Sequence, residues 1–324
     1  MTTPDHAQGA ARFVALSGGV GGAKLSLGLA HLLGERLAVI VNTGDDFEHM
    51  GLYVSPDIDT TLYTLSGLVN TETGWGRRDE SWSFMAAVAK LGGPQWFRLG
   101  DGDLAMHVER THRLREGETL TAVTAHFAAS LGLAARVVPM SDDPVRTLVE
   151  TDMGRLAFQE YFVREQCRPA VREIRFDGAS AARASAAALA ALAAPDLQGV
   201  IICPSNPYLS VDPILAVPGM VEALRACAAP VIAVTPLIAG KAVKGPTAKI
   251  MGELGLAVDA ATVARHYAGT IDGFVLDRED AESESRLSLP VLVTDTLMRS
   301  FDDKRNLAEA CLRFCAELGR ARRR

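Results

Sequence analysis

The sequence contains few cysteines, and none has a spacing typical of metal binding or redox chemistry. Five cysteines in 324 residues make an odd number, and no Cys-x-x-Cys pair occurs. Cys311 and Cys315 stand four residues apart, as in packing along a helix. This composition argues against a metal site built on thiolates and favours reduced thiols packed as small apolar groups.

Long apolar runs and an excess of positive charge are also absent. No apolar run approaches the ~20 residues that a membrane span needs. The N-terminus, with Asp5 and His6 before a polar stretch, lacks the charged and apolar regions of a signal peptide. A formal net charge of −6 and a pI near 5.7 argue against a nucleic-acid-binding surface. We therefore expect a cytoplasmic protein that binds neither nucleic acid nor membrane.

The residues that are abundant indicate an ordinary core-forming protein, since 48% of the chain is hydrophobic. Short runs rich in Val and Ile mostly alternate with helix-like segments, which is typical of a parallel sheet. We predict a Rossmann-like α/β fold with helices on both faces of the sheet and a smaller inserted helical or α+β lobe. The predicted strands span 13–17, 37–41, 135–139, 199–203, 230–234, 272–276 and 290–294.

Residues 1–324 are predicted to form a single nucleotide-binding domain with insertions at about 63–133 and 150–177. The first insertion looks helical and carries all three tryptophans, and the second mixes aromatic residues with Arg and Glu. An alanine-rich helix is expected over 179–194, and a last helix over 304–320. The last helix should turn Leu307, Cys311 and Phe314 inward.

The most informative segment runs from Phe13 to Lys24, where an apolar strand breaks into glycines and then into a helical pattern. Glycine lets the main chain approach a ligand closely, and the start of a helix attracts anions. The spacing fits neither the dinucleotide pattern, whose third glycine is replaced by Lys24, nor the Walker pattern. We predict a phosphate-binding turn, with a ligand-free strand–helix turn as the alternative. Its glycines are Gly18, Gly19, Gly21 and Gly22.

Acidic residues gather after the second predicted strand. Asp45, Asp46, Asp57 and Asp59 fall within fifteen residues of one another. One acid would be enough to hold a ribose hydroxyl, so four of them beside a phosphate turn favour Mg²⁺, which binds carboxylates together with phosphate oxygens and water. The alternative is helix capping by Asp57 or Asp59.

Three further loops combine polar and charged residues. Pro204-Ser-Asn-Pro207 offers Ser205 and Asn206 on a stiff turn after a strand, which suits recognition of a base or a phosphate, or else an ordinary rigid turn. The glycine-rich segment 237–249 carries three lysines and indicates a second anion site. Arg98 stands between aromatic residues and carboxylates, a setting that suits a flat, partly anionic ligand.

Taken together, these loops resemble one family, the 2-phospho-L-lactate transferases that make coenzyme F-420. The match runs nearly end to end and in order, so no single motif carries it. The matching segments are Ser17-Gly-Gly-Val-Gly-Gly-Ala-Lys-Leu25, Asn42-Thr-Gly-Asp-Asp46, Ser55-Pro-Asp-Ile-Asp-Thr60, Leu99-Gly-Asp101, Pro139-Met-Ser-Asp-Asp143, Phe158-Gln-Glu-Tyr-Phe162, Pro204-Ser-Asn-Pro207 and Lys244-Gly-Pro246.

The resemblance implies a Mg²⁺-dependent transfer. Members of the family join the phospho-acid part of a guanosine diphosphate-linked three-carbon acid to the ribityl hydroxyl of the deazaflavin Fo and release GMP. The acid carried by the donor, whether lactyl, enolpyruvyl or glyceryl, stays open.

The resemblance also implies roles for individual residues. Asp59 is expected to act on the Fo hydroxyl and the metal, with Asp45 and Asp57 as further ligands. Arg98 is expected to contact Fo. The remaining expected substrate-binding residues are the four glycines and Lys24 of the first turn, together with Ser205, Asn206, Lys244 and Gly245, the last four for the guanosine diphosphate part. A homodimer is a further expectation.

Two other classes of function remain as alternatives. A non-enzymatic sugar-nucleotide-binding regulator would share the glycine turn and the Asp-Asp strand end. It would not be expected to carry the Ser-Pro-Asp-Ile-Asp-Thr, Trp-Phe-Arg-Leu-Gly-Asp and Lys-Gly-Pro segments together. An NAD(P)-dependent oxidoreductase is disfavoured mainly by the misplaced third glycine.

Overall fold

The structure, a computed structural model, describes residues 12–322. Its centre is a parallel sheet with the strand order β14-β13-β10-β9-β1-β2-β5. Val14 of β1 lies opposite Ala38 of β2 on one side and Val200 of β9 on the other. The predicted sheet is confirmed, with strand ends within one residue of those expected. The strands are β1 Phe13–Ser17, β2 Leu37–Val41, β5 Arg136–Pro139, β9 Gly199–Ile202, β10 Val231–Val234, β13 Gly273–Asp277 and β14 Val291–Thr294.

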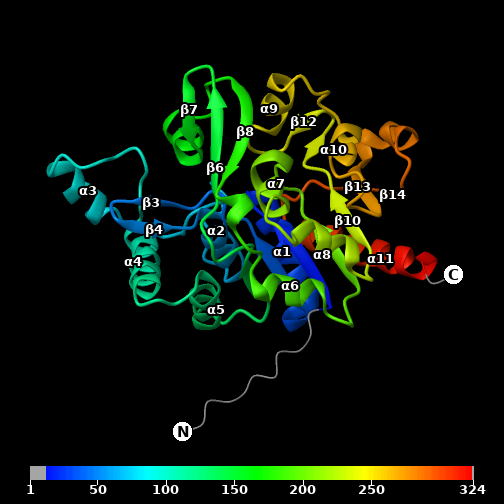
Figure 1. Ribbon diagram of the computed structural model, residues 1–324, viewed down its shortest axis with the longest axis horizontal. Helices are drawn as coiled ribbons and strands as arrows, with labels where there is room; N and C mark the ends of the chain where they lie inside the picture. The colour runs from blue at the N-terminus through cyan, green and yellow to red at the C-terminus, as the bar shows by residue number, and fades with distance from the viewer. Residues whose placement is uncertain (1–11, 323–324) are drawn as a thin grey trace, which may run out of the picture.

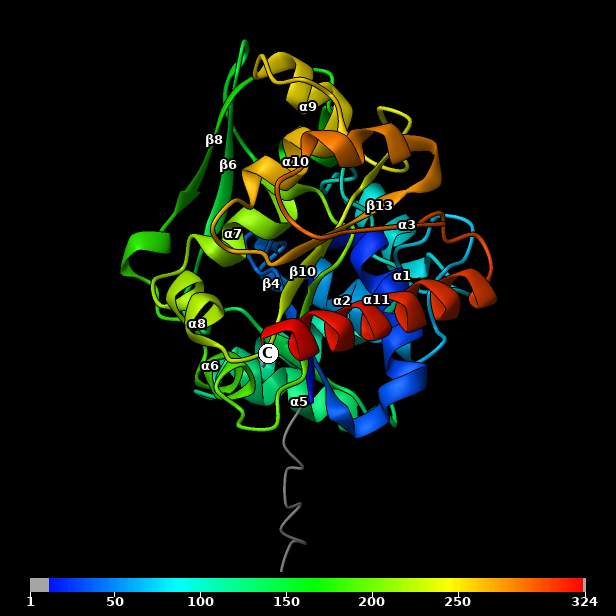
Figure 2. The same ribbon diagram turned by 90° about the vertical axis from the view of Figure 1, so that its right-hand side faces the viewer.

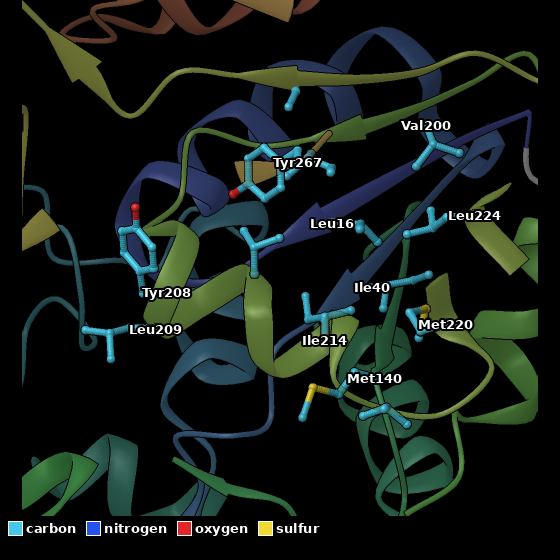
Figure 3. Packing of buried hydrophobic residues seen from close by; sticks show 14 of the residues in the cluster. Leu16, Ile40, Met140, Val200, Tyr208, Leu209, Ile214, Met220, Leu224 and Tyr267 are labelled. Carbon is cyan, nitrogen blue, oxygen red and sulfur yellow. The ribbon is translucent and has the colours of Figure 1, made fainter. Parts of the chain in front are cut away.

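Helices cover both faces of this sheet, as predicted (Figure 1). Successive strand residues point to opposite faces, so Leu16 and Ile40 join one buried cluster while Ala15 and Val39 join the other. Figure 3 shows the first cluster, in which Leu16, Ile40 and Val200 of the sheet pack near Met220 and Leu224. The buried strands therefore need apolar residues at every position, which is why they read as unbroken Val- and Ile-rich runs.

The helices on the two faces come from different parts of the chain. One face is covered by α1 Gly19–Leu33, α2 Pro56–Leu65, α5 Leu120–Ser130 and α11 Phe301–Arg322. The other is covered by α6 Ala186–Leu192, α7 Asp212–Leu215, α8 Met220–Ala226, α9 Thr247–Glu253 and α10 Ala260–His266. The last helix lies across α1 (Figure 2) and buries Leu307, Cys311 and Phe314, as predicted.

The alanine-rich helix is much shorter than predicted. The expected helix over 179–194 is a short 3-10 turn followed by α6, which covers only Ala186–Leu192. Ser185 begins α6 because its side chain accepts a hydrogen bond from the Ala188 amide. The preceding residues cross to the end of β5, where Ala184 pairs with Ser141. Tertiary pairing has thus overridden the helix propensity of alanine.

The two segments predicted as insertions differ in structure. Residues 66–82 form turns, and α3 Ser83–Lys90 and α4 Asp101–Arg115 follow before α5. An antiparallel sheet of β6 Arg146–Thr151, β7 Gly154–Ala157 and β8 Val171–Asp177 extends away from the main sheet (green in Figure 1). The short elements are β3 Phe47–His49, β4 Leu52–Val54, β11 Leu237–Ile238, β12 Lys241–Ala242, the 3-10 helices η1 Gly34–Arg36, η3 Ala179–Ala181 and η5 Arg278–Arg286, and the π-helices η2 Glu160–Arg164 and η4 Pro207–Val211.

Among residues 12–322, no helix has both the length and the apolar character required to cross a bilayer.

Candidate active site at the carboxyl ends of the strands

The candidate site lies where the strand order reverses around β1, between β2 and β9. Open parallel sheets bind ligands at such a point, outside the carboxyl ends of the strands. Here the turn that follows β1 touches the loop after β9 and the first turn of α2. The Gly18 amide donates to Ser205 Oγ at 3.3 Å, and the Gly19 amide donates to Asp57 Oδ1 at 2.8 Å. The predicted glycine turn, acidic segment and Pro-Ser-Asn-Pro loop therefore meet.

The glycines of the first turn have a packing role that the sequence left open. Helix α1 begins at Gly19, so Gly21 and Gly22 lie inside its first turn rather than in a free loop. A Cβ at Gly21 would overlap the Pro204 carbonyl oxygen, and one at Gly22 would lie 2.6 Å from Ser205 Oγ. Only glycine lets α1 approach the loop after β9 this closely.

One of the predicted carboxylates, Asp57, contacts this turn, and a second, Asp45, lies near Asp57. Asp57 lies in the first turn of α2 and accepts hydrogen bonds from the Gly19 amide and from Asn42 Nδ2, the latter at 3.0 Å. Burial raises the pKa of Asp57 to about 6. Asp45 is also buried, and its pKa is raised well above the ordinary value by burial and then by the charge of Asp57. The two carboxylates are close enough to repel each other, so a cation between them would be favoured.

The ends of β1 and β2 carry buried oxygen atoms of the kind that Mg²⁺ binds. Within the described residues 12–322, Asp45 Oδ1, Ser17 Oγ and Thr43 Oγ1 are buried without a hydrogen-bond partner. All three are oxygen atoms that follow or end the adjacent strands β1 and β2. Hard cations prefer oxygen ligands, and a buried carboxylate oxygen without a donor is a costly arrangement unless protonation or a cation neutralises it.

Asp59 faces a different direction from Asp57. Two residues along a helix are about 200° apart around its axis, and Asp59 accordingly meets α4 instead of the glycine turn. Arg110 holds both oxygens of Asp59, with Nη1 donating to Oδ2 at 3.2 Å and Nη2 donating to Oδ1. Burial raises the pKa of Asp59, and the Arg110 guanidinium opposes that rise. The structure thus brings Asp45 and Asp57 together near the glycine turn, whereas Asp59 pairs with the buried guanidinium of Arg110.

Sequence reasoning missed the α4 residues that surround Asp59. Arg110 Nη1 lies 3.3 Å from His107 Nδ1, and because arginine only donates, this nitrogen of His107 accepts. The opposite ring nitrogen, Nε2, lies 3.2 Å from Asp103 Oδ2, while the Tyr63 hydroxyl donates to Asp103 Oδ1 at 2.7 Å. The signal was available, since Asp103, His107 and Arg110 are spaced i, i+4, i+7 and therefore share one helix face.

Asp46 is a fourth buried carboxylate with a separate set of partners. It accepts hydrogen bonds from Ser55 Oγ at 2.8 Å and from the Tyr53 hydroxyl at 3.0 Å. Burial raises the pKa of Asp46 to about 7, with Arg146 opposing the rise. Its neighbours Ser55 and Tyr53 precede α2, so Asp46 fixes the segment that presents Asp57.

The predicted cationic residues divide into two groups. Lys24 donates to the Met298 carbonyl at 3.2 Å, and Lys244, next to Gly245 in an exposed loop, donates to the Thr73 carbonyl. The pKa of Lys244 is lowered by partial burial and then by the ammonium of Lys24, so these two lysines belong to one region. Arg98 instead stacks on the Trp82 ring, 4.1 Å from its centroid, beside α3.

The side-chain oxygen of Asn206 is not free to recognise a ligand. Its Oδ1 begins η4 by accepting from the Tyr208 and Leu209 amides, at 3.0 and 3.2 Å. Its Nδ2 is buried and has no hydrogen-bond partner within the described part of the chain. The amide group therefore retains donor capacity for a ligand.

Comparison with known families identifies the family of the chain. The family model described as "2-phospho-L-lactate transferase CofD" matches residues 13–296. The chain belongs to the 2-phospho-L-lactate transferase family. The predicted family and the predicted transferase class are both confirmed.

Relatives from two groups of organisms carry different names. A protein named phosphoenolpyruvate transferase in Kitasatospora aureofaciens is 39% identical over 300 residues, which cover 88% of this chain and 93% of that protein. A protein named 2-phospho-L-lactate transferase in Methanopyrus kandleri is 39% identical over 311 residues, covering 95% and 98%. A solved structure of a UPF0052 family protein from Bacillus halodurans has a TM-score of 0.61 at 14% identity, over 93% of this chain and 98% of that one, and supports the fold alone.

Proposed function

We propose that this protein transfers a phospho-three-carbon-acid group from a guanosine diphosphate-linked donor to the ribityl hydroxyl of 7,8-didemethyl-8-hydroxy-5-deazariboflavin (Fo), releases GMP, and serves coenzyme F-420 biosynthesis. The observation that carries the proposal is the contact between the glycine turn and Asp57, because it joins a turn suited to phosphate to two neighbouring buried carboxylates. The two names of the relatives both specify a phosphorylated three-carbon acid.

The reaction is a displacement at phosphorus. The ribityl oxygen of Fo forms a bond to the phosphorus that carries the three-carbon acid, the bond from that phosphorus to the bridging oxygen of the pyrophosphate breaks, and GMP leaves with the electron pair. The hydroxyl proton passes to a carboxylate. Such transfers depend mainly on positioning and on neutralising charge.

The residues of this chain divide these tasks. Asp45 and Asp57 would hold Mg²⁺, which when bound supplies positive charge to the phosphate oxygens. Lys24 and Lys244 add further positive charge near the glycine turn. Asp59 accepts the Fo hydroxyl in this scheme, since each carboxylate oxygen has a second lone pair besides the one that Arg110 occupies. Arg98 beside Trp82 contacts the ring of Fo.

Product analysis tests the proposal. The purified protein is incubated with Fo, Mg²⁺ and guanosine diphosphate-linked donors of each acid, and the deazaflavin products are measured by mass spectrometry. We expect one donor to give Fo that carries the phospho-acid group, with one GMP released for each product, and we expect excess EDTA to stop the reaction. Binding of guanosine diphosphate without product from any donor would favour the regulator instead. Sedimentation of the same sample tests the expected homodimer.

A further inference from the structure

A hairpin between α2 and α3 projects toward the glycine turn. We call residues 69–77 the Trp75 hairpin. Val69 pairs with Arg77 as an isolated antiparallel bridge, the Asn70 amide donates to the Gly76 carbonyl at 3.0 Å, and the Gly74 amide donates to the Asn70 carbonyl at 2.8 Å. These bonds give the hairpin a fixed backbone.

The tip of the Trp75 hairpin lies against the glycine turn and against Lys244. A Cβ at Gly74 would lie 2.8 Å from Val20 Cγ1 and 3.2 Å from Lys244 Nζ, so the backbone touches both. Gly74 has a φ of +77°, a conformation that glycine adopts without strain. Lys244 donates to the carbonyl of Thr73, one residue earlier. The hairpin therefore borders the region where phosphate is expected.

Trp75 is the large hydrophobic residue that this hairpin leaves in solvent. Its side chain is 56% exposed, the largest exposed fraction among the three tryptophans. Thr73 Oγ1 donates to the Trp75 carbonyl at 2.6 Å, so the backbone at this residue is held. Consecutive Cα atoms are about 3.8 Å apart, which puts Trp75 next to the residue that touches the ammonium of Lys244. An exposed indole beside a lysine offers an aromatic face for a ring and a cation for a phosphate.

We propose that Trp75 stacks on the guanine ring of the guanosine diphosphate part while Lys244 and the glycine turn hold its phosphates. The proposal rests on the proposed function and adds the residue that recognises the base. Guanine is favoured over the Fo ring because the Trp75 hairpin contacts the lysine expected to bind the nucleotide. The guanidinium of Arg98 already stacks on the ring of the other exposed indole, Trp82, next to α3.

Calorimetry with GDP and with inorganic pyrophosphate, both with Mg²⁺, tests this role. Stacking of a base on an aromatic side chain contributes roughly a factor of ten or more to affinity. We expect Trp75→Leu to weaken GDP binding at least about ten-fold and to leave pyrophosphate binding within about two-fold, since pyrophosphate has no ring. Trp75→Phe should recover most of the GDP affinity. Trp82→Leu is the matched control and should bind GDP as the wild type does.

Fluorescence gives a second readout. In a Trp82→Phe/Trp96→Phe background Trp75 is the remaining indole, and GDP should quench its emission while pyrophosphate should not. Equal GDP affinity in wild type and Trp75→Leu, equal losses for GDP and pyrophosphate, or quenching by Fo but not by GDP would each overturn the proposal. If the wild type catalyses transfer but Trp75→Leu keeps its GDP affinity, the proposed function stands and only the stacking role fails. Absence of GDP binding to the wild type would remove both.

Discussion

At the scale of single residues, the pairing of Asp59 with Arg110 changes how the catalytic aspartate must be tested. Asp59→Asn leaves a buried guanidinium without its anion, and breaking a buried pair costs about 3–5 kcal/mol. Loss of activity in that variant would therefore mix misfolding with chemistry. A variant that removes both charges, Asp59→Leu/Arg110→Met, avoids this because apolar replacement of a buried pair is often neutral.

We expect the free energy of unfolding of the Asp59→Leu/Arg110→Met variant to lie within about 2 kcal/mol of the wild-type value. Its turnover should fall by about 100-fold or more, because the Fo hydroxyl loses its acceptor. Urea unfolding measures the first quantity and product formation at saturating donor the second. Arg110→Met alone should be less stable than the double variant. Near-normal turnover in the double variant would reduce Asp59 to a structural partner of Arg110.

The buried carboxyl group of Asp46 should make the free energy of unfolding depend on pH. Its pKa rises from an ordinary value of 3.8 to about 7 in the fold, so folding favours its protonated form. That contribution to stability is complete below about pH 4 and is lost as the pH rises through about 7, a change of about 4 kcal/mol. The free energy of unfolding of Asp46→Asn should therefore decline less between pH 4 and pH 7 than that of wild type. Urea titrations in EDTA would show this, and parallel curves for the two proteins would contradict it.

At the scale of elements, the sequence predicted the sheet well and the side-chain directions poorly. Each strand is buried on both faces, so its apolar run is unmistakable. The resemblance implies that Asp57 and Asp59 both act on the metal, and α2 places them about 200° apart around its axis, so that Asp57 contacts the glycine turn while Asp59 contacts Arg110. The predicted extent of α6 was wrong because the helix begins only after Ser185, where the pairing of Ala184 with Ser141 has held the preceding residues in an extended conformation. Local propensity carries neither kind of information.

The junction of α1 with the loop after β9 is the element on which the site geometry depends most. Gly21→Ala would drive a methyl group into the Pro204 carbonyl, so either the helix or the loop must shift. We expect a loss of stability of about 1–3 kcal/mol and weaker GDP binding. Gly252→Ala in α9, where nothing lies within 4 Å of the added carbon, is the matched control and should be neutral or stabilising by up to about 1 kcal/mol. Thermal unfolding and calorimetry compare the two, and equal behaviour would show that the close approach at Gly21 is unimportant.

At the scale of the whole molecule, the carboxylates of Asp45 and Asp57 at the end of the sheet should lower the stability of the metal-free protein and favour metal binding. Asp45 and Asp57 repel each other in a buried region, and Asp45 Oδ1 has no hydrogen-bond donor among residues 12–322. Asp45→Asn removes that repulsion, so we expect the metal-free variant to be more stable than metal-free wild type by about 1–3 kcal/mol. A gain of this size raises the melting temperature by a few degrees in a chain this long.

Addition of Mg²⁺ should reverse that order. Wild type gains stability in proportion to the logarithm of the ion concentration above its dissociation constant, about 2.7 kcal/mol at a hundred-fold excess, whereas Asp45→Asn loses a carboxylate ligand and should gain much less. Asp196→Asn serves as the control, because this exposed carboxylate pairs with Arg12 before β1 and β9, at the amino-terminal edge of the parallel sheet. It should follow wild type in both EDTA and Mg²⁺. Melting curves of the three proteins across a Mg²⁺ series test this prediction. Asp45→Asn could prove less stable than wild type without metal, or it could gain as much stability from Mg²⁺. Either result would mean that the buried carboxylates at the carboxyl ends of the strands do not form the cation site.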